Sequence, residues 1–217
     1  MTTAYDSILA CLNRCPTMIN GLKWFPSLEP AVNNDQDWPP FGFPNSAEIT
    51  DCNLMVVKNA LDKLGDQCRS ILEIGVDRNG SRSFTNLFLR AKSRECVYVG
   101  VDLDDKSHIR NVEQNQHFLQ ANSHNQQQVR QFLQNLGVTE LDILMIDGWH
   151  SVNTAVNDWS YTDLLSDHGI VLLHDTNAHP GPAALFDAVD ETVWRKFRFC
   201  TQDDMGIAVF SKVRKGD

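Results

Sequence analysis

Short apolar segments alternate with longer amphipathic segments along most of this chain. The apolar runs have the length and character of buried strands, and they cover 70–76, 95–103, 117–122, 141–147 and 169–175. The segments between them carry apolar residues at helical spacing and predict helices over 47–64, 81–91, 104–115, 123–136, 152–166 and 183–193. Ser46 is the expected N-cap of the first helix. Strands that alternate with helices in this way predict a parallel sheet with helices on both faces.

The last two apolar segments follow a different pattern. Segments 196–201 and 206–212 are separated by only four residues, QDDM, which is too short for a crossover helix. They are therefore expected to pair as an antiparallel hairpin. The predicted fold is α/β, a single domain with a mostly parallel seven-stranded sheet and one antiparallel C-terminal hairpin strand.

Composition changes near residue 46, which suggests a boundary. The stretch 24–46 contains five prolines and several aromatic residues, so it cannot form a long helix or a central strand. We divide the chain into an N-terminal arm over 1–46 and a main domain over 47–217. The arm either covers apolar surface or acts as a lid over a substrate, and contacts between two copies of the chain are a further role for it.

Overall composition narrows the class of protein. The 217 residues carry a net charge of −9 and are 42% hydrophobic, as in an ordinary globular domain. The negative charge argues against nucleic acid and anionic membranes as partners. No apolar run is long enough to span a bilayer, and the first residues lack the features of a secretion signal. The six cysteines are scattered, which favours reduced thiols and a cytoplasmic location, while the oligomeric state stays open.

Polar residues gather where the predicted strands end. Ligands of open α/β sheets bind at the carboxyl ends of the strands, so these residues are the candidates for chemistry. In chain order they are Glu73 and Gly75, then Asp102, then Asn122, then Asp147 and His150, then Asp175 and Thr176. Buried carboxylates are costly without partners, which makes acids at strand ends informative.

The first turn and the second strand together suggest an adenosine-containing cofactor. Gly75 and Gly80 provide a tight turn that lets a ligand approach the backbone. Asp102 ends the next strand, where a carboxylate can accept hydrogen bonds from both ribose hydroxyls. The alternative for Asp102 is an N-cap of the following helix. Asp77 stands where a dinucleotide-binding turn has its middle glycine, which counts against a nicotinamide-dependent oxidoreductase.

These residues resemble a known family. E-x-G after the first strand, VGVD at the second and LDILMID at the fourth are similar to class I S-adenosylmethionine-dependent methyltransferases. The stretch DGWHSVNTAVNDW, followed by a Gly turn and HDT, resembles the methyltransferase 24 group, whose pattern is DGxHxYxxVxxD. That group lies near the metal-dependent sugar O-methyltransferases. The resemblance spans roughly residues 70–212 and implies a Rossmann-like fold.

The resemblance also implies roles for the strand-end residues. Glu73, Gly75, Gly80 and Ser81 would line the methionine end of S-adenosylmethionine, Asp102 would bind its ribose, Asn122 would lie near its adenine, and Asp147 would border it. Asp147 and Asp175 would bind Mg²⁺, with Thr176 as third ligand. His150 would be the general base, acting with Asp147 on a small hydroxylated acceptor such as a sugar.

Two departures from the family pattern leave an alternative open. Thr176 stands where related enzymes often have an acid or an amide, and Val152 replaces the tyrosine of the pattern. A methyltransferase-like scaffold without activity would account for both. Among the remaining residues, His174 is expected to hold a neighbouring group in place rather than bind metal. His179 flanks the substrate or lies in an ordinary loop, and Trp149 is a candidate wall of the pocket.

Overall fold

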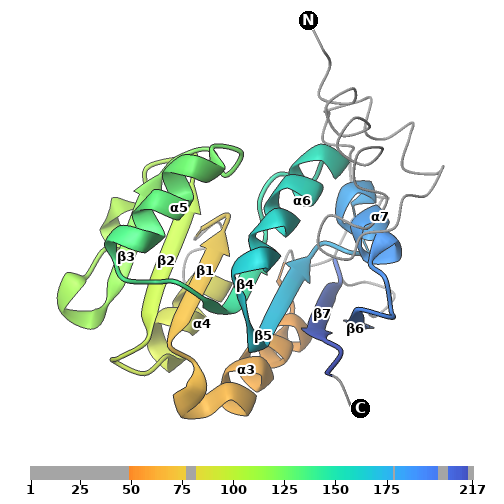
Figure 1. The fold of residues 1–217 in the computed structure, drawn as a ribbon, viewed down its shortest axis with the longest axis horizontal. Helices are drawn as coiled ribbons and strands as arrows, with labels where there is room; N and C mark the ends of the chain where they lie inside the picture. The colour runs from red at the N-terminus through yellow and green to blue at the C-terminus, as the bar shows by residue number, and fades with distance from the viewer. Residues whose placement is uncertain (1–48, 77–81, 178, 200–204, 215–217) are drawn as a thin grey trace, which may run out of the picture.

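One mixed sheet forms the centre of the molecule (Figure 1). The computed structural model describes residues 49–76, 82–177, 179–199 and 205–214. In that part of the chain seven strands have the order β3-β2-β1-β4-β5-β7-β6, and β7 runs antiparallel to both of its neighbours. This arrangement confirms the predicted α/β fold with its C-terminal hairpin. The strands are β1 (Ser70–Ile74), β2 (Val97–Asp102), β3 (Gln116–Gln120), β4 (Leu141–Ile146), β5 (Leu165–His174), β6 (Trp194–Phe199) and β7 (Ile207–Lys212).

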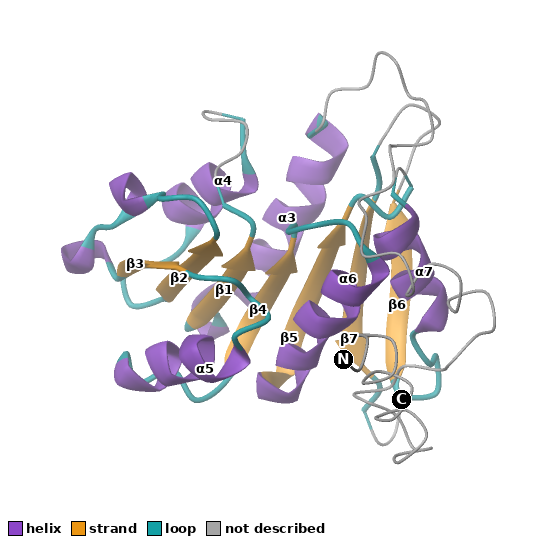
Figure 2. Ribbon diagram, turned by 90° about the horizontal axis from the view of Figure 1, so that it is seen from above, coloured by secondary structure: helices purple, strands orange, loops and turns teal. Residues whose placement is uncertain are grey.

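Helices cover both faces of the sheet (Figure 2). On one face lie α3 (Asp51–Leu64) and α4 (Phe84–Ala91). On the other lie α5 (Gln126–Asn135), α6 (Val152–Trp159) and α7 (Pro180–Ala188). None of the described helices is long and apolar enough to cross a membrane.

Each face of the sheet has its own hydrophobic core. Leu72, Leu144 and Val171 pack with the helices α5 to α7, where Trp159 meets Phe210 edge to face at 4.9 Å between ring centroids. Their neighbours along the strands, among them Ile71 and Ile143, pack instead against α3 and α4. Because successive strand residues point to opposite faces and both faces are buried, the central strands read as continuous apolar runs.

Some predicted helix boundaries were wrong. The first helix begins at Asp51 rather than at residue 47, because Thr50 and Asn53 form a reciprocal capping box. Ser46, its expected cap, lies outside the described residues, as does the whole arm over 1–46. That division of the chain therefore stays a prediction.

The helix predicted over 104–115 does not exist. Two short 3-10 turns, Ser107–Ile109 and Val112–Gln114, occupy this region. The carboxylates of Asp102 and Asp105 accept hydrogen bonds from backbone N–H groups two residues further on, at 2.8 Å each. Such local bonds compete with helical bonding, which explains the outcome.

The two helices predicted nearest the C-terminus are also shorter than expected or shifted. The helix predicted over 152–166 ends at Trp159 and continues as a 3-10 turn, Ser160–Leu164, after which the chain enters β5. The helix predicted over 183–193 is instead Pro180–Ala188. Proline is favoured in the first helical turn because its missing N–H has no partner there in any helix.

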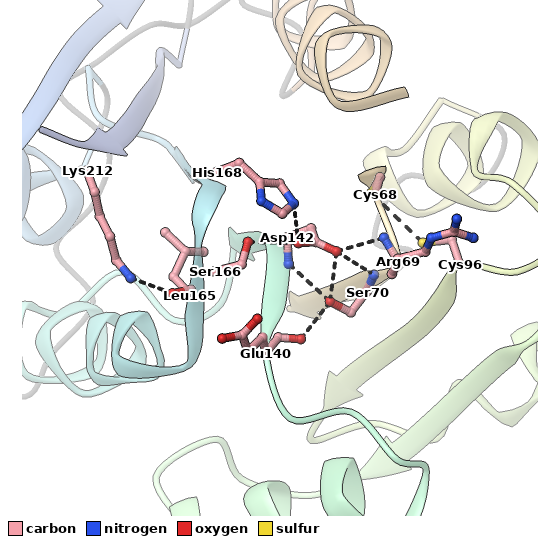
Figure 3. A network of polar contacts seen from close by, with 10 residues as sticks. All are labelled: Cys68, Arg69, Ser70, Cys96, Glu140, Asp142, Leu165, Ser166, His168 and Lys212. Carbon is pink, nitrogen blue, oxygen red and sulfur yellow. Dashed lines mark hydrogen bonds and ion pairs between the residues drawn. The ribbon is translucent and has the colours of Figure 1, made fainter. Parts of the chain in front are cut away.

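A buried carboxylate joins the amino-terminal ends of three strands (Figure 3). Asp142 Oδ2 accepts hydrogen bonds from the backbone N–H groups of Arg69 at 2.7 Å and Ser70 at 3.2 Å. Its Oδ1 accepts from the Ser166 hydroxyl at 2.8 Å and lies 2.9 Å from His168 Nε2. This acid ties β1, β4 and β5 together at the edge of the sheet opposite the predicted site.

The backbones of β1 and β4 approach closely where both strands end. Gly75 has a φ of +83°, and its N–H donates to Val101 O at 3.0 Å. A Cβ at this position would lie 2.1 Å from Asp147 O. Glycine is therefore required here both for its conformation and for its lack of a side chain.

We expect Gly75→Ala to destabilise the fold by at least about 3 kcal/mol, because strain at positive φ adds to a backbone clash. Gly137→Ala is the matched control, since Gly137 has a φ of +76° but no atom within 4 Å of where its Cβ would stand. Its expected cost is about 1 kcal/mol. Urea unfolding of both variants measures the difference in stability. If both variants lost the same free energy of unfolding, the close approach of Gly75 to Asp147 would not contribute to the cost.

Candidate functional site

The predicted site residues meet at the carboxyl edge of the sheet, where the strand order reverses. β1 lies between β2 and β4, so the chain moves in one direction from β1 to β2 and β3 and then crosses back to β4 and β5. A crevice outside the strands forms at such a switch point. Asp102, Asp147 and Asp175 stand on three of these neighbouring strand ends.

Asp102 fastens the first turn to the second strand. Its Oδ2 accepts a hydrogen bond from the Val76 backbone N–H at 2.8 Å, and its Oδ1 accepts from Asp104 N–H at 2.8 Å. The side chain is half-buried and lies beside Gly75 and Val76 at the switch point. The alternative role as cap of a long helix falls away, because no such helix follows.

Glu73 and Asn122 lie in different surroundings. Glu73 is buried within β1 on the face that packs against α3 and α4, and its Oε2 accepts a hydrogen bond from the Tyr98 hydroxyl. Asn122 is exposed in the loop after β3, where its Oδ1 accepts from His124 N–H at 2.9 Å. The two remaining cofactor candidates, Gly80 and Ser81, lie outside the described residues.

His174 stands between the two aspartates that were predicted to share a metal ion. Its Nδ1 lies 2.8 Å from Asp147 Oδ1 and 3.3 Å from Asp175 Oδ1. The ring is buried and packs edge to face on Phe84, with the centroids 4.9 Å apart. Its prediction as a residue that holds its neighbours in place agrees with these contacts.

The other oxygen of Asp175 contacts His150, which in turn packs on a further histidine, His179. His150 Nε2 lies 2.6 Å from Asp175 Oδ2. The His150 ring stacks on His179, with centroids 3.8 Å apart and an angle of 27° between the planes. All three side chains are buried. Sequence reasoning left the position of His179 open, since no pattern in the chain indicates that it contacts His150.

Local backbone geometry fixes the positions of Asp175 and His150. Asp175 has a left-handed φ of 61° directly after β5, and its carbonyl accepts the N–H of His179 at 3.0 Å. Ser151 caps α6 by accepting from Thr154 N–H at 3.1 Å, which sets the loop that carries His150. A non-glycine residue at positive φ is strained, and such strain is common at functional sites.

Asp147, His174 and Asp175 all have shifted pKa values, and the pKa values of the two acids shift in opposite directions. Burial alone would raise the pKa of Asp175, but His174 and His150 outweigh it and lower that pKa far below its usual range. Burial raises the pKa of Asp147, against the opposing effect of His174. Burial also opposes protonation of His174, yet the negative charges of Asp175 and Asp147 raise its pKa well above 6.5.

Thr176 is buried in contact with a different segment. A Cβ placed on Gly206 would lie 2.9 Å from Thr176 Oγ1, and this hydroxyl has no hydrogen-bond partner within the described part of the chain. The third ligand-capable atom next to the carboxylates of Asp147 and Asp175 is a nitrogen of His174. The ligand-capable atoms of Asp147, His174 and Asp175 all lie within 4.8 Å of one another.

One buried acid was not assigned a role from the sequence, although it ends the DGxHxYxxVxxD pattern. Asp158 on α6 is fully buried, and its Oδ2 has no hydrogen-bond partner among the described residues. That oxygen lies 3.3 Å from where a Cβ on Gly148 would stand, beneath the loop of His150. Burial raises the pKa of Asp158 to about 7, although Ser123 and Asn157 lower it.

Part of this chain matches a known family model. Residues 72–176, just under half of the chain, match the family model of the methyltransferase 24 group, which is described as a methyltransferase domain. The matched segment runs from β1 to the end of β5 and so contains every described strand-end candidate. No match was found among curated protein sequences.

Solved structures with the same fold are only distantly similar in sequence. The O-methyltransferase from Bacillus cereus in complex with SAH is 12% identical, with a TM-score of 0.56 over 98% of this chain and 100% of that one. MycE from the mycinamycin biosynthetic pathway, in complex with Mg, SAH and mycinamycin VI, is 14% identical, with a TM-score of 0.55 over 74% of this chain. Only 49% of the MycE chain is covered, so this chain spans about half of that protein. CalS11, a TDP-rhamnose 3'-O-methyltransferase of calicheamicin biosynthesis, is 14% identical, with a TM-score of 0.54 over 76% of this chain and 80% of that one.

The buried acid Asp158 predicts a pH-dependent stability. Its folded pKa, about 7, lies above the value of 3.8 for an unperturbed Asp, so its contribution is fully present below about pH 4. That contribution, about 4 kcal/mol, is lost progressively as the pH rises from about 4 through about 7. Asp158→Asn stays neutral at every pH and should be more stable than the wild type at about pH 8.

Urea unfolding at about pH 5 and about pH 8 measures this effect. Asp167→Asn is the control, because Asp167 is an exposed acid on β5. An unchanged pH dependence in Asp158→Asn would mean that Asp158 is already ionised in the fold.

Proposed function

We propose that this chain is a class I S-adenosylmethionine-dependent methyltransferase that methylates an oxygen atom of a small hydroxylated acceptor. The match of residues 72–176 to the methyltransferase 24 family model supports this assignment. The observation that carries the proposal is the buried contact between His150 and Asp175, 2.6 Å long, at the switch point of the sheet. It supplies an oriented base next to the place where a cofactor of this fold binds.

The cofactor would lie across the ends of β1 and β2. The Gly75 turn lies at the end of β1, against the backbone of Asp147, and Asp102 at the end of β2 would offer its carboxylate to the ribose hydroxyls. Asn122 lies further along this edge, in the loop after β3, where the adenine is expected. S-adenosylmethionine supplies the methyl group as part of a sulfonium, whose positive charge suits an edge that carries several acids.

His150 would act as the general base. Asp175 holds Nε2 of the ring, so the proton from the acceptor hydroxyl would be taken up at Nδ1. As the acceptor oxygen forms its bond to the methyl carbon, the bond from that carbon to sulfur breaks and a neutral thioether leaves. The partnership resembles other His–Asp pairs, in which the carboxylate orients the ring and stabilises its charged form.

The donor set also fits a divalent cation. Asp147 and Asp175 turn one carboxylate oxygen each toward the same point, with His174 Nδ1 as a third donor. Mg²⁺ prefers oxygen at every ligand position. A Mg²⁺ ion here would therefore keep several water ligands, or it would replace His174 as the partner of the two carboxylates. Such an ion would lower the pKa of the acceptor hydroxyl. Thr176 stays a candidate ligand by sequence only.

The acceptor is expected to present a hydroxyl on a ring. MycE, solved with mycinamycin VI, and CalS11, a TDP-rhamnose 3'-O-methyltransferase, share the fold, which supports a sugar-like acceptor. Trp149, next to His150 in the β4–α6 loop, is 55% exposed and offers a flat apolar surface against which such a ring can stack. A small acceptor, rather than nucleic acid, also suits the net charge of −9.

Binding of SAH tests the cofactor assignment. We expect the wild type to bind SAH in isothermal titration and Asp102→Asn to bind about 10- to 100-fold more weakly, because one charged acceptor is lost. The amide keeps one oxygen for Val76 N–H. Asp105→Asn, three residues away in an exposed turn, should bind normally. Absence of SAH binding to the wild type would refute the proposed function.

Turnover tests the base. On a panel of sugars, catechols and hydroxy acids, we expect His150→Gln to lower kcat by about 10²- to 10⁴-fold with SAH affinity unchanged. His168→Gln controls for loss of any histidine, because His168 lies at the opposite edge of the sheet. A wild type that binds SAH but methylates none of these acceptors would favour the inactive scaffold.

A further inference from the structure

Two histidines, His150 and His179, lie next to Asp175 outside the cluster that contains Asp147. Asp175 turns Oδ1 toward His174 and Asp147, and Oδ2 toward His150. Ligand-capable atoms of His150, Asp175 and His179 all lie within 4.8 Å of one another. These three side chains are at most 8% exposed. One carboxylate thus separates two clusters of donors that share no other residue.

Three separate segments hold this second cluster in place. His150 lies in the β4–α6 loop, Asp175 follows β5, and His179 caps the first turn of α7. The start of α7 lies directly on the β4–α6 loop, since a Cβ on Gly181 would come within 2.0 Å of His150 O. The bond from His179 N–H to Asp175 O closes the third side. The donors are therefore brought together by the fold before any ligand arrives.

The donor chemistry identifies the class of ion. Two imidazoles and one carboxylate suit first-row transition ions such as Zn²⁺, Co²⁺ or Fe²⁺, whereas Mg²⁺ and Ca²⁺ take oxygen ligands. Ligand atoms around a tetrahedral Zn²⁺ lie about 3.4 Å apart, so shifts on the order of 1 Å would open the His150–Asp175 contact enough to admit an ion. We propose that His150, Asp175 and His179 form a binding site for a first-row transition-metal ion, with water completing its coordination.

Such an ion would compete with the proposed chemistry. It would occupy Asp175 Oδ2 and a ring nitrogen of His150, and would so separate the proposed base from the carboxylate that orients it. Zn²⁺ is then expected to inhibit methyl transfer and leave SAH affinity unchanged. This consequence rests on the proposed function, whereas binding of the ion does not.

Titration with Co²⁺ alone tests the site, because the visible spectrum of bound Co²⁺ reports the ion without any enzyme assay. We expect one Co²⁺ per chain, displaced by Zn²⁺. His179→Phe keeps a ring that can stack on His150 but removes the nitrogen ligand, and it should weaken Co²⁺ binding by at least about 10-fold. His150→Gln should do the same, which guards against a folding defect in one variant. His168→Ala should bind Co²⁺ as the wild type does, because His168 lies at the opposite edge of the sheet.

Two results would overturn the proposal. One is a wild type that binds no Co²⁺ at millimolar concentration. The other is binding that survives His179→Phe but is lost in Asp147→Asn, which would place the ion in the Asp147–His174–Asp175 cluster. SAH titration on the same samples shows separately whether the methyltransferase assignment stands.

Discussion

The buried carboxylate of Asp175 is the interaction around which this site is organised. An ionised group without water is costly unless charges and hydrogen bonds compensate it. His174 and His150 do so from two sides, which explains why the pKa of Asp175 falls although burial opposes ionisation. Removal of either histidine would leave a charge without one of its partners, so the site depends on all three residues together.

Close packing of backbone segments brings the groups of this site together. Gly75 lets the end of β1 lie directly on Asp147, and Gly181 lets α7 begin directly on the loop of His150. In both places a side chain would force the segments apart. Acidic and imidazole groups from β4, β5 and α7 therefore meet within a few ångströms, next to the turn that is expected to hold the cofactor.

At the opposite edge of the sheet, a buried carboxylate has a structural role. Asp142 is also a buried acid at a strand end, but most of its partners are backbone N–H groups and a serine hydroxyl, with a single histidine, His168, beside one oxygen (Figure 3). Its hydrogen bonds join β1, β4 and β5 at their starts. A buried carboxylate therefore does not indicate function by itself. The two cases differ in the balance of partners, since backbone and hydroxyl groups predominate around Asp142, whereas Asp175 lies between two histidines, which can take up a proton or bind a metal.

The sequence by itself determined the alternation of strands and helices, the C-terminal hairpin and the identity of the residues at the strand ends. These follow from hydrophobic period and loop length, which are local properties of the chain. It misplaced the helix over 104–115, because side-chain hydrogen bonds of Asp102 and Asp105 compete with helical bonding over a few residues. Only the tertiary structure decided that His174 lies between Asp147 and Asp175 and that His179 stacks on His150. Those contacts depend on strand order, on the left-handed backbone of Asp175 and on the docking of α7, and none of these is encoded in the spacing of residues along the chain.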